Sequence, residues 1–240
     1  MQAKGSPKED DNTRKWRADD PRRLRMAEKR MAILQAARPI LLRDGLGGAT
    51  LDRVAAEGGI AKMTLYRHFP SKEALFEGLV GAMCDEMRQA IEKAPSADAS
   101  RPCAQRLADE LRAFTSTLLE PDALALYRLV VAEGSRHPGA ARAFDDSGMR
   151  VIRRRLAALL EAGGVPANRS WPVAGEVVAL ALGDAYQRAA LGIAEKDDGE
   201  AFARQIDVAV AHAFPSTHEA PKGDRFKVSA ATTAKAPPSR

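Results

Sequence analysis

Apolar residues recur at helical spacing through most of the chain, and Gly, Pro and capping residues separate the resulting segments. The first predicted helix runs from about Ala27 to Asp44 and ends at Gly45. Two short helices and a long one follow, at about 51–58, 61–69 and 72–93. Later helices are predicted near 104–119, 122–136, 139–163, 172–193 and 198–213, with breaks at Pro121, Pro138, Gly163-Gly164, Pro172 and 196–199. The pattern therefore predicts an all-α protein of about nine helices.

Composition supports this fold class, because hydrophobic residues make up 45% of the 240 and β-branched runs are scarce. Polar, charged segments with Pro and Gly stand at both ends, where they predict a disordered basic arm over 1–25 and a disordered tail over 216–240. Between them we expect a three-helix head over 26–80 and a larger helical body over 81–215.

The net charge of +5 is unevenly distributed. Lys and Arg outnumber Asp and Glu over residues 1–80 and again over 216–240, whereas acidic residues prevail over 81–215. A basic head on a slightly acidic body favours a polyanion as partner. A membrane surface could also accept such a head.

The N-terminal residues contain no apolar leader, and no stretch of the chain has the length of a membrane span, so we expect a cytoplasmic protein without a membrane partner. Cys84 and Cys103 match no metal-ligand or redox spacing and are interpreted as reduced apolar residues. The four histidines lie in unrelated contexts. Neither a metal site nor a cofactor is predicted, and no nucleophile elbow, Walker loop or dinucleotide fingerprint supports an enzyme.

The two short helices are joined by a turn containing Gly58 and Gly59. In the second helix Ala61, Leu65 and Phe69 form a predicted inward stripe. That arrangement leaves Lys62, Met63, Thr64, Tyr66 and Arg67 facing outward. Such a pair is typical of a helix-turn-helix, whose second helix fits the major groove of DNA. Many short helix pairs, however, bind no DNA.

The identity of the residues distinguishes a DNA-binding helix pair from other short helix pairs. Residues 33–80, ILQAARPILLRDGLGGATLDRVAAEGGIAKMTLYRHFPSKEALFEGLV, resemble the DNA-binding head of the TetR family of bacterial regulators. The resemblance includes the Gly45 stop, the Thr50 cap, the Gly59-Ile60 turn, Thr64-Leu65-Tyr66, His68-Phe69 and Ser71-Lys72-Glu73. Three positions depart from the usual pattern: Ala61 replaces a Ser or Thr, Gly58 stands where alanine is frequent, and Leu46 replaces an aromatic. Ala61 removes an N-cap hydroxyl, which costs on the order of 1 kcal/mol.

The resemblance implies a role for each outward residue. Lys62 is expected to reach a base edge, with Met63 and Arg67 adding contacts in the groove. Thr50, Thr64, Tyr66, His68 and Lys72 are expected to hold phosphates, which sets the register on DNA without reading sequence. Each residue taken singly also fits an ordinary role: Tyr66 could pack on a neighbouring helix, His68 could bond a carbonyl, and Lys62 or Arg67 could be a solvated charge.

The body gives weaker signals. Leu126 to Phe144 resemble a C-terminal domain that accompanies TetR heads, which implies small-molecule binding and pairing of two copies through the last two long helices. Those helices carry more apolar residues than one exposed face needs, which favours a homodimer interface, although burial within one subunit would explain the same residues. Candidate pocket residues are Phe114, Leu119, Tyr127, Met149, Trp171 and Tyr186.

The sequence thus predicts a homodimeric, sequence-specific regulator that binds double-stranded operator DNA, interpreted as a repressor released by a largely apolar small molecule. The alternative is an architectural or constitutive DNA-binding protein without an effector. That alternative predicts a filled body and weak sequence preference.

Overall fold

The computed structural model describes residues 21–93, 100–195 and 197–215, and every regular element within these ranges is a helix. In chain order the elements are α1 (Pro21–Gly48), α2 (Leu51–Glu57), α3 (Lys62–His68), α4 (Lys72–Glu92), α5 (Cys103–Leu118), α6 (Pro121–Glu133), α7 (Pro138–Phe144), the π-helix η2 (Asp145–Met149), α8 (Arg150–Ala162), α9 (Ala167–Leu191) and α10 (Asp198–Ala213). The all-α prediction is confirmed. Helix 139–163 of the prediction corresponds to the continuous run of α7, η2 and α8.

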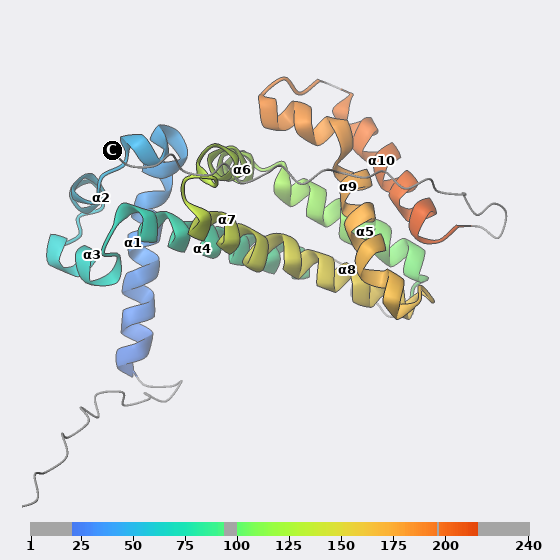
Figure 1. The fold of residues 1–240 in the computed structure, drawn as a ribbon, viewed down its shortest axis with the longest axis horizontal. Coiled ribbons are helices and arrows are strands. Elements are labelled where there is room, and N and C mark those ends of the chain that lie inside the picture. Colours follow the sequence, from blue (N-terminus) through green and yellow to red (C-terminus); the bar gives the residue numbers. More distant parts are fainter. Residues whose placement is uncertain (1–20, 94–99, 196, 216–240) are drawn as a thin grey trace, which may run out of the picture.

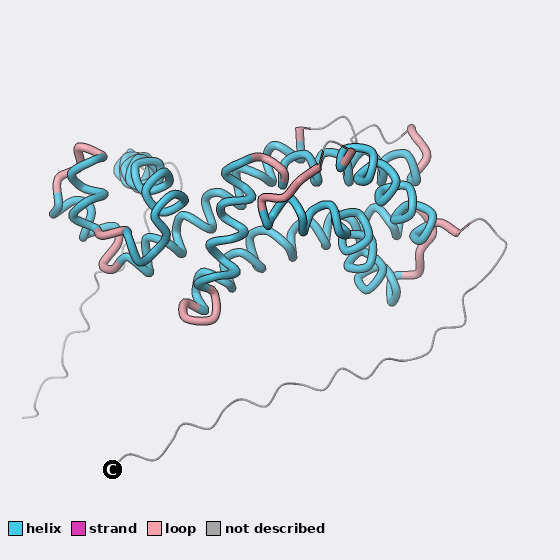
Figure 2. Tube along the Cα trace, turned by 90° about the horizontal axis from the view of Figure 1, so that it is seen from above, coloured by secondary structure: helices cyan, strands magenta, loops and turns pink. Residues whose placement is uncertain are grey.

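The molecule is elongated, with α1, α2 and α3 gathered at one end (Figure 1). Helix α4 leaves this head and runs into the body beside α7 and α8, while α9 and α10 lie at the end away from the head. The same division appears in the perpendicular view (Figure 2). Because α4 belongs to both ends, a displacement of its C-terminal half can reach the head.

Head and body share apolar surface where they meet. The core that contains Leu65 and Phe69 of the head also contains Leu126 of α6 and Ala140 of α7. A second core fills the body between α5, α8, α9, α10 and the end of α4. Tyr186 and Phe202 belong to a third, smaller cluster, against which Tyr127 packs. The head is therefore supported by α6 and α7 as well as joined to the body through α4.

Two helix starts differ from the prediction. Helix α1 begins at Pro21, so residues 21–25 are helical and the predicted arm is wrong there; residues 1–20 and 216–240 lie outside the described residues. Proline suits the first position of a helix, but the first turns of α1 are exposed and carry no apolar stripe that a pattern could reveal. Helix α9 begins at Ala167 and continues through Pro172, which was predicted to break it.

Candidate DNA-binding surface

Short-range hydrogen bonds define where α2 and α3 begin and end. The Thr50 hydroxyl accepts from the backbone N–H of Arg53 at 3.2 Å and caps α2. Gly59 turns the chain with φ +60°, and Gly58 approaches Ala36 so closely that a Cβ at position 58 would lie 2.6 Å from the Ala36 Cβ. Glycine in place of the alanine frequent at position 58 therefore fits the close approach of α1. Helix α3 begins after Ala61 without a side-chain cap.

Helix α3 presents one apolar and one polar face. Leu65 and Phe69 are buried, as predicted. Ala61 is exposed, so its place in the inward stripe is wrong: it precedes the helix in an extended conformation, and Ile60 packs against the core. Lys62, Met63, Tyr66 and Arg67 are exposed and Thr64 is half-buried.

A carboxylate on α2 holds two of these outward residues. The Lys62 ammonium lies 2.9 Å from Asp52 Oδ2, and the Tyr66 hydroxyl donates to Asp52 Oδ1 at 3.4 Å. The hydrogen bond from Lys62 lowers the pKa of Asp52, and the same bond raises the pKa of Lys62. Asp52 is therefore charged at neutral pH and stands on the surface where DNA contacts were predicted. The sequence analysis assigned Asp52 no part in that surface.

The remaining predicted contacts lie at the edges of this surface. Thr50 is exposed, although its hydroxyl already serves the cap. The Lys72 ammonium donates to the Leu46 carbonyl at 3.2 Å, which ties the start of α4 to the end of α1. His68 is half-buried with its Nε2 enclosed, and burial, followed by the nearby cations Arg67 and Arg30, lowers its pKa.

Two arginines fix the head, and sequence reasoning missed both. Arg53 pairs with Asp44 at 2.7 Å and with Glu57 at 2.6 Å, joining the end of α1 to α2. The Arg30 guanidinium lies over the Phe69 ring at 4.2 Å from its centre and donates to the His68 carbonyl at 3.3 Å. Neither residue belongs to an apolar stripe, so the hydrophobic pattern gave no signal for them.

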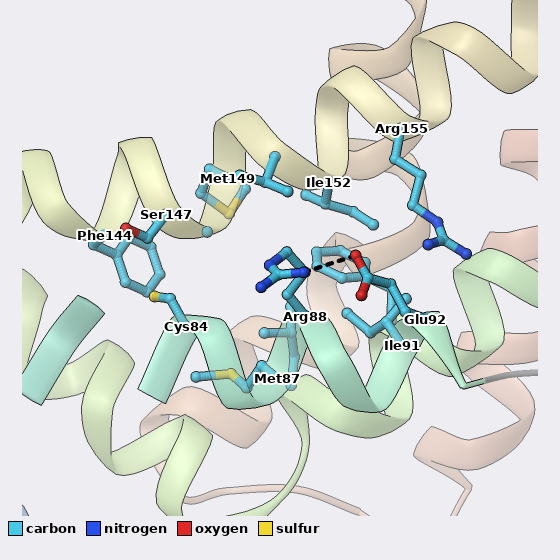
Figure 3. A pocket seen from close by; sticks show the side chains of 14 residues that line it. Cys84, Met87, Arg88, Ile91, Glu92, Phe144, Ser147, Met149, Ile152 and Arg155 are labelled. Atoms are coloured by element: carbon cyan, nitrogen blue, oxygen red, sulfur yellow. Dashed lines mark hydrogen bonds and ion pairs between the residues drawn. The ribbon is translucent and has the colours of Figure 1, made fainter. Parts of the chain in front are cut away.

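The body contains an apolar cavity of about 50 Å³ between α4, α5 and the run from Phe144 to Arg155. Figure 3 shows Cys84, Met87 and Ile91 of α4 facing Met149 and Ile152 across it. The charged groups at its boundary include the Arg88–Glu92 pair, at 2.8 Å, and Arg155, which also pairs with the buried Glu110. Burial raises the pKa of the Cys84 thiol to about 12.

The structure separates the six predicted pocket residues. Phe114 and Met149 line this cavity. Leu119, Tyr127 and Tyr186 belong to the small cluster beside Phe202, where the rings of Tyr127 and Tyr186 are 5.3 Å apart. Trp171 is 40% exposed and lies under the Arg153 guanidinium at 4.5 Å, lining an open hollow on α8 and α9. Aromatic character alone could not distinguish a cavity wall from an ordinary core contact.

Comparison with known proteins decides the family. The family model described as bacterial regulatory proteins of the TetR family matches residues 33–79, and the C-terminal domain model of AefR-like transcriptional repressors matches residues 105–214. The chain belongs to the TetR family. It is therefore a DNA-binding transcription regulator, and its head and body are those of DNA-binding regulators.

Solved structures agree with the fold of this TetR-family regulator. A TetR-family transcriptional regulator from Mesorhizobium loti superposes with a TM-score of 0.69 at 24% identity, covering 79% of this chain and 96% of the other. The flavonoid-responsive regulator FrrA superposes with a TM-score of 0.64 at 28% identity, covering 78% of this chain and 95% of the other.

The nucleoid occlusion factor SlmA of Vibrio atlanticus is 30% identical over 133 residues, 55% of this chain and 59% of that protein. SlmA of Vibrio vulnificus is 29% identical over 135 residues, 54% of this chain and 58% of that protein. The chain thus spans less than two thirds of the length of the curated relatives it matches.

Two further features are absent from the part of the chain that the structure describes. Across residues 21–93, 100–195 and 197–215 no group of three or more His, Cys, Asp or Glu side chains could hold a metal ion. Among the helices of those ranges, none is long and apolar enough to cross a membrane.

Proposed function

We propose that this TetR-family regulator is a cytoplasmic repressor that binds a near-palindromic operator as a homodimer and is released when a mainly apolar small molecule enters the cavity on α4. In this proposal residues 26–80 form the DNA-binding domain and residues 81–215 the effector-binding and dimerisation domain. The observation that carries it is the apolar cavity lying on the helix that also belongs to the head.

The exposed face of α3 supports the division of labour among its residues. Lys62, Met63 and Arg67 project from a helix whose opposite face is fixed by Leu65 and Phe69, so their positions are held by a rigid core. We assign them to base edges in the major groove. Thr50, Thr64 and Tyr66 flank them and are assigned to phosphates. Lys72 and His68 join this group as weaker candidates, since the Lys72 ammonium already donates to the Leu46 carbonyl and the His68 Nε2 is enclosed.

The cavity is small, so it must widen before a drug-sized ligand can bind. Pockets for drug-sized ligands enclose roughly 300–1,000 Å³, several times the 50 Å³ present. A ligand must therefore force α4 and the run of η2 and α8 apart. The facing side chains are mainly Met, Ile, Leu and Phe, which favour an apolar ligand and, in the case of Met, repack readily. The name of FrrA makes flavonoids a reasonable first class of compound to test.

Ion pairs connect this region to the head. Arg38 of α1 pairs with Glu86 of α4 at 2.7 Å and with Asp122 of α6 at 2.8 Å. Glu86 lies between Cys84 and Met87, both of which line the cavity. A displacement of α4 by a ligand would thus pull on α1 directly. Tilting both heads changes the separation of the two α3 helices, which must match successive major grooves about 34–36 Å apart.

The homodimer is proposed on α9 and α10, for a reason that differs from the sequence argument. Most of their apolar residues are buried within the subunit, which is the alternative explanation of the pattern. The large apolar side chains that stay exposed on these helices are Val208 of α10, at 56%, and Leu191 and Trp171 of α9, at 75% and 40%. These exposed residues support an interface on α9 and α10. Members of the family also dimerise through their last two long helices, which supports the same interface.

Reciprocal titration tests the proposed switch. A compound that weakens operator binding must itself bind more weakly when operator DNA is present, by the same factor, typically about 5- to 150-fold. Calorimetry with and without operator measures both affinities. Equal ligand affinity in the two conditions would exclude that compound as the effector.

A constitutive DNA-binding protein remains the second candidate, because the small cavity leaves the unliganded body almost filled and the SlmA relatives are named for nucleoid occlusion. Thermal shifts across a library of apolar compounds separate the two functions. A constitutive DNA-binding protein predicts that no compound shifts the unfolding temperature. A ligand-released repressor predicts compounds that do, and their thermal shift should disappear when Ile152→Trp fills the cavity.

A further inference from the structure

The first turns of α1 are exposed along their whole length. Every side chain that the structure describes between Pro21 and Ala32 is exposed, and burial begins only at Ile33 and Leu34. We call residues 21–32 the α1 extension. Figure 1 shows it in blue, running past α3 and out of the head. At 1.5 Å per residue the extension is about 18 Å long.

The α1 extension carries a concentrated positive charge. Its cations outnumber its one carboxylate, Glu28, by five to one, and they are Arg22, Arg23, Arg25, Lys29 and Arg30. Elsewhere in the head carboxylates balance the cations, as in the ion pairs of Arg53 and Lys62 described above. The extension is therefore suited to a polyanionic partner.

The side of α1 that packs onto the head becomes basic in the extension. Ala37 and Ile33 are buried on this side. Continuing towards the N-terminus in steps of three or four residues leads to Arg30, Met26 and Arg22. A helix that merely ended in water would need no such change of side-chain character along one face.

The extension passes the C-terminal end of α3. The Arg30 guanidinium lies over the Phe69 ring and donates to the His68 carbonyl. Burial lowers the pKa of this histidine, and the charges of Arg67, Arg30 and Lys29 lower it further. These three cations therefore gather at one end of α3. A recognition helix in the major groove has the phosphate backbones bordering that groove close to it.

We propose that the α1 extension is a second DNA-binding element, whose Arg25 and Lys29 side chains bind phosphates bordering the groove that α3 enters. The two residues are four apart and so lie side by side on the helix. A DNA strand has a phosphate about every 3.4 Å, so the extension is long enough to face about five of them. The inference adds a contact site to the proposed function and rests on α3 lying in the major groove.

A membrane surface is the other polyanion that a basic helix can bind. Such binding requires a continuous apolar face beside the cations. The large apolar residues of the extension are Leu24, Met26 and Met31, and helical spacing puts Met26 on the opposite side from the other two. The extension therefore lacks that face, which favours DNA as its partner.

Lys29→Gln removes one of the proposed phosphate contacts from an exposed position. The salt dependence of DNA binding should become shallower by about 0.9 in log K per log salt for each head on DNA, which is about eightfold in affinity at 0.1 M salt. Every duplex offers phosphates, so the enriched and the scrambled duplex should lose the same factor. Arg25→Gln should behave in the same way.

Arg43→Gln is the matched control, because it removes one cation from the other end of the same helix. Arg43 pairs with Asp44, which Arg53 continues to hold. This variant reports the general effect of lowering the positive charge of the head, and its affinity should fall less than twofold. A loss as large as that of Lys29→Gln would show general charge attraction and overturn the inference.

Anisotropy titrations over a salt series measure the affinities, and phosphate ethylation interference on the enriched duplex locates the contacts. Ethylation of a few phosphates should block the native protein and leave Lys29→Gln binding unchanged. Identical interference patterns and salt dependence for the two proteins would overturn the inference.

Phosphatidylglycerol vesicles test the membrane instead. Capture of the native protein that Lys29→Gln abolishes, with an unchanged interference pattern, would assign the extension to a membrane and also overturn the inference. If the native protein fails to distinguish the two duplexes, the proposed function fails, whereas the salt dependence on scrambled DNA still decides the role of the extension.

Discussion

At the scale of single residues, Leu65 and Phe69 determine which side of α3 is offered to DNA. Both side chains are almost fully buried, so the helix cannot rotate without exposing them. The spacing of these apolar residues was visible in the sequence, and the outward direction of Lys62, Met63, Tyr66 and Arg67 followed from it. The Asp52 contacts were not visible, because they depend on how α2 crosses α3 and leave no periodic pattern.

Lys62→Ala should lower affinity for the best operator by about 1–3 kcal/mol and leave scrambled DNA nearly unaffected, since a base contact is lost only where that base is present. Tyr66→Phe should weaken both complexes alike, because a phosphate contact carries no sequence information. Anisotropy titrations of both variants on both duplexes measure this. An equal loss on the two duplexes for Lys62→Ala would reassign it to a phosphate.

The Cys84 thiol should resist alkylation at neutral pH. Reaction requires the thiolate, and burial, with a smaller contribution from Asp85, raises the pKa of Cys84 to about 12, so the thiol stays protonated in the folded protein from pH 7 to 9. Titration with a thiol reagent should find Cys103 reacting first and both cysteines reacting only in denaturant. Rapid labelling of Cys84 in the native Cys103→Ser variant at pH 7 would contradict the burial of this side chain.

At the scale of helices, pattern and structure agree where a boundary depends on local chemistry. Ser71 caps α4 by accepting from the Ala74 N–H at 3.2 Å, and Pro121 and Pro138 begin α6 and α7. Prediction and structure differ where tertiary packing, and not local chemistry, determines whether a helix continues. Helix α9 retains Pro172 because α8 and α10 pack against it, and the π-helix η2 interrupts a run whose sequence reads as ordinary helix.

Two glycines of α4 should respond oppositely to alanine. Alanine favours a helix interior by about 1 kcal/mol over glycine, and Gly81 has open space around it, so Gly81→Ala should stabilise the protein by about 0.5–1 kcal/mol. A Cβ at Gly78 would lie 2.7 Å from the buried Phe69 ring, and such overpacking costs about 1–3 kcal/mol.

Gly78→Ala should therefore destabilise the protein, whereas Gly81→Ala should stabilise it. Urea unfolding of the two variants beside the native chain measures the difference. Equal stabilisation by both substitutions would mean that Phe69 moves aside and that the contact between α3 and α4 is looser than described.

At the scale of the whole molecule, sequence reasoning recognised the division into head and body but not how the two are joined. The shared core with α6 and α7, and the Arg38 pairs, involve residues far apart in the sequence. The cavity was equally hidden, since its walls are ordinary core residues until the helices are placed together. The many apolar residues of α9 and α10 favoured a dimer interface in the sequence analysis. In the structure most of them are buried in the subunit's own core.

The proposed dimer interface predicts that Val208→Glu separates the subunits. Two copies of the new carboxylate would face each other across a two-fold interface and lose water, which should raise the dimer dissociation constant by about tenfold or more. Val131→Glu is the matched control, because Val131 is 65% exposed and belongs to α6, not to either helix of the proposed interface. Sedimentation equilibrium should show dissociation for Val208→Glu alone, and the same dissociation for both variants would place the interface elsewhere.

The central claim is that α3 reads a specific operator. Its most direct test is the affinity of the native protein for the duplex most enriched from a random library, compared with a scrambled duplex at the same salt concentration. The account predicts an enriched sequence made of two inverted half-sites, bound at least about 10³-fold more tightly than the scrambled duplex. Equal affinity for the two duplexes would contradict it.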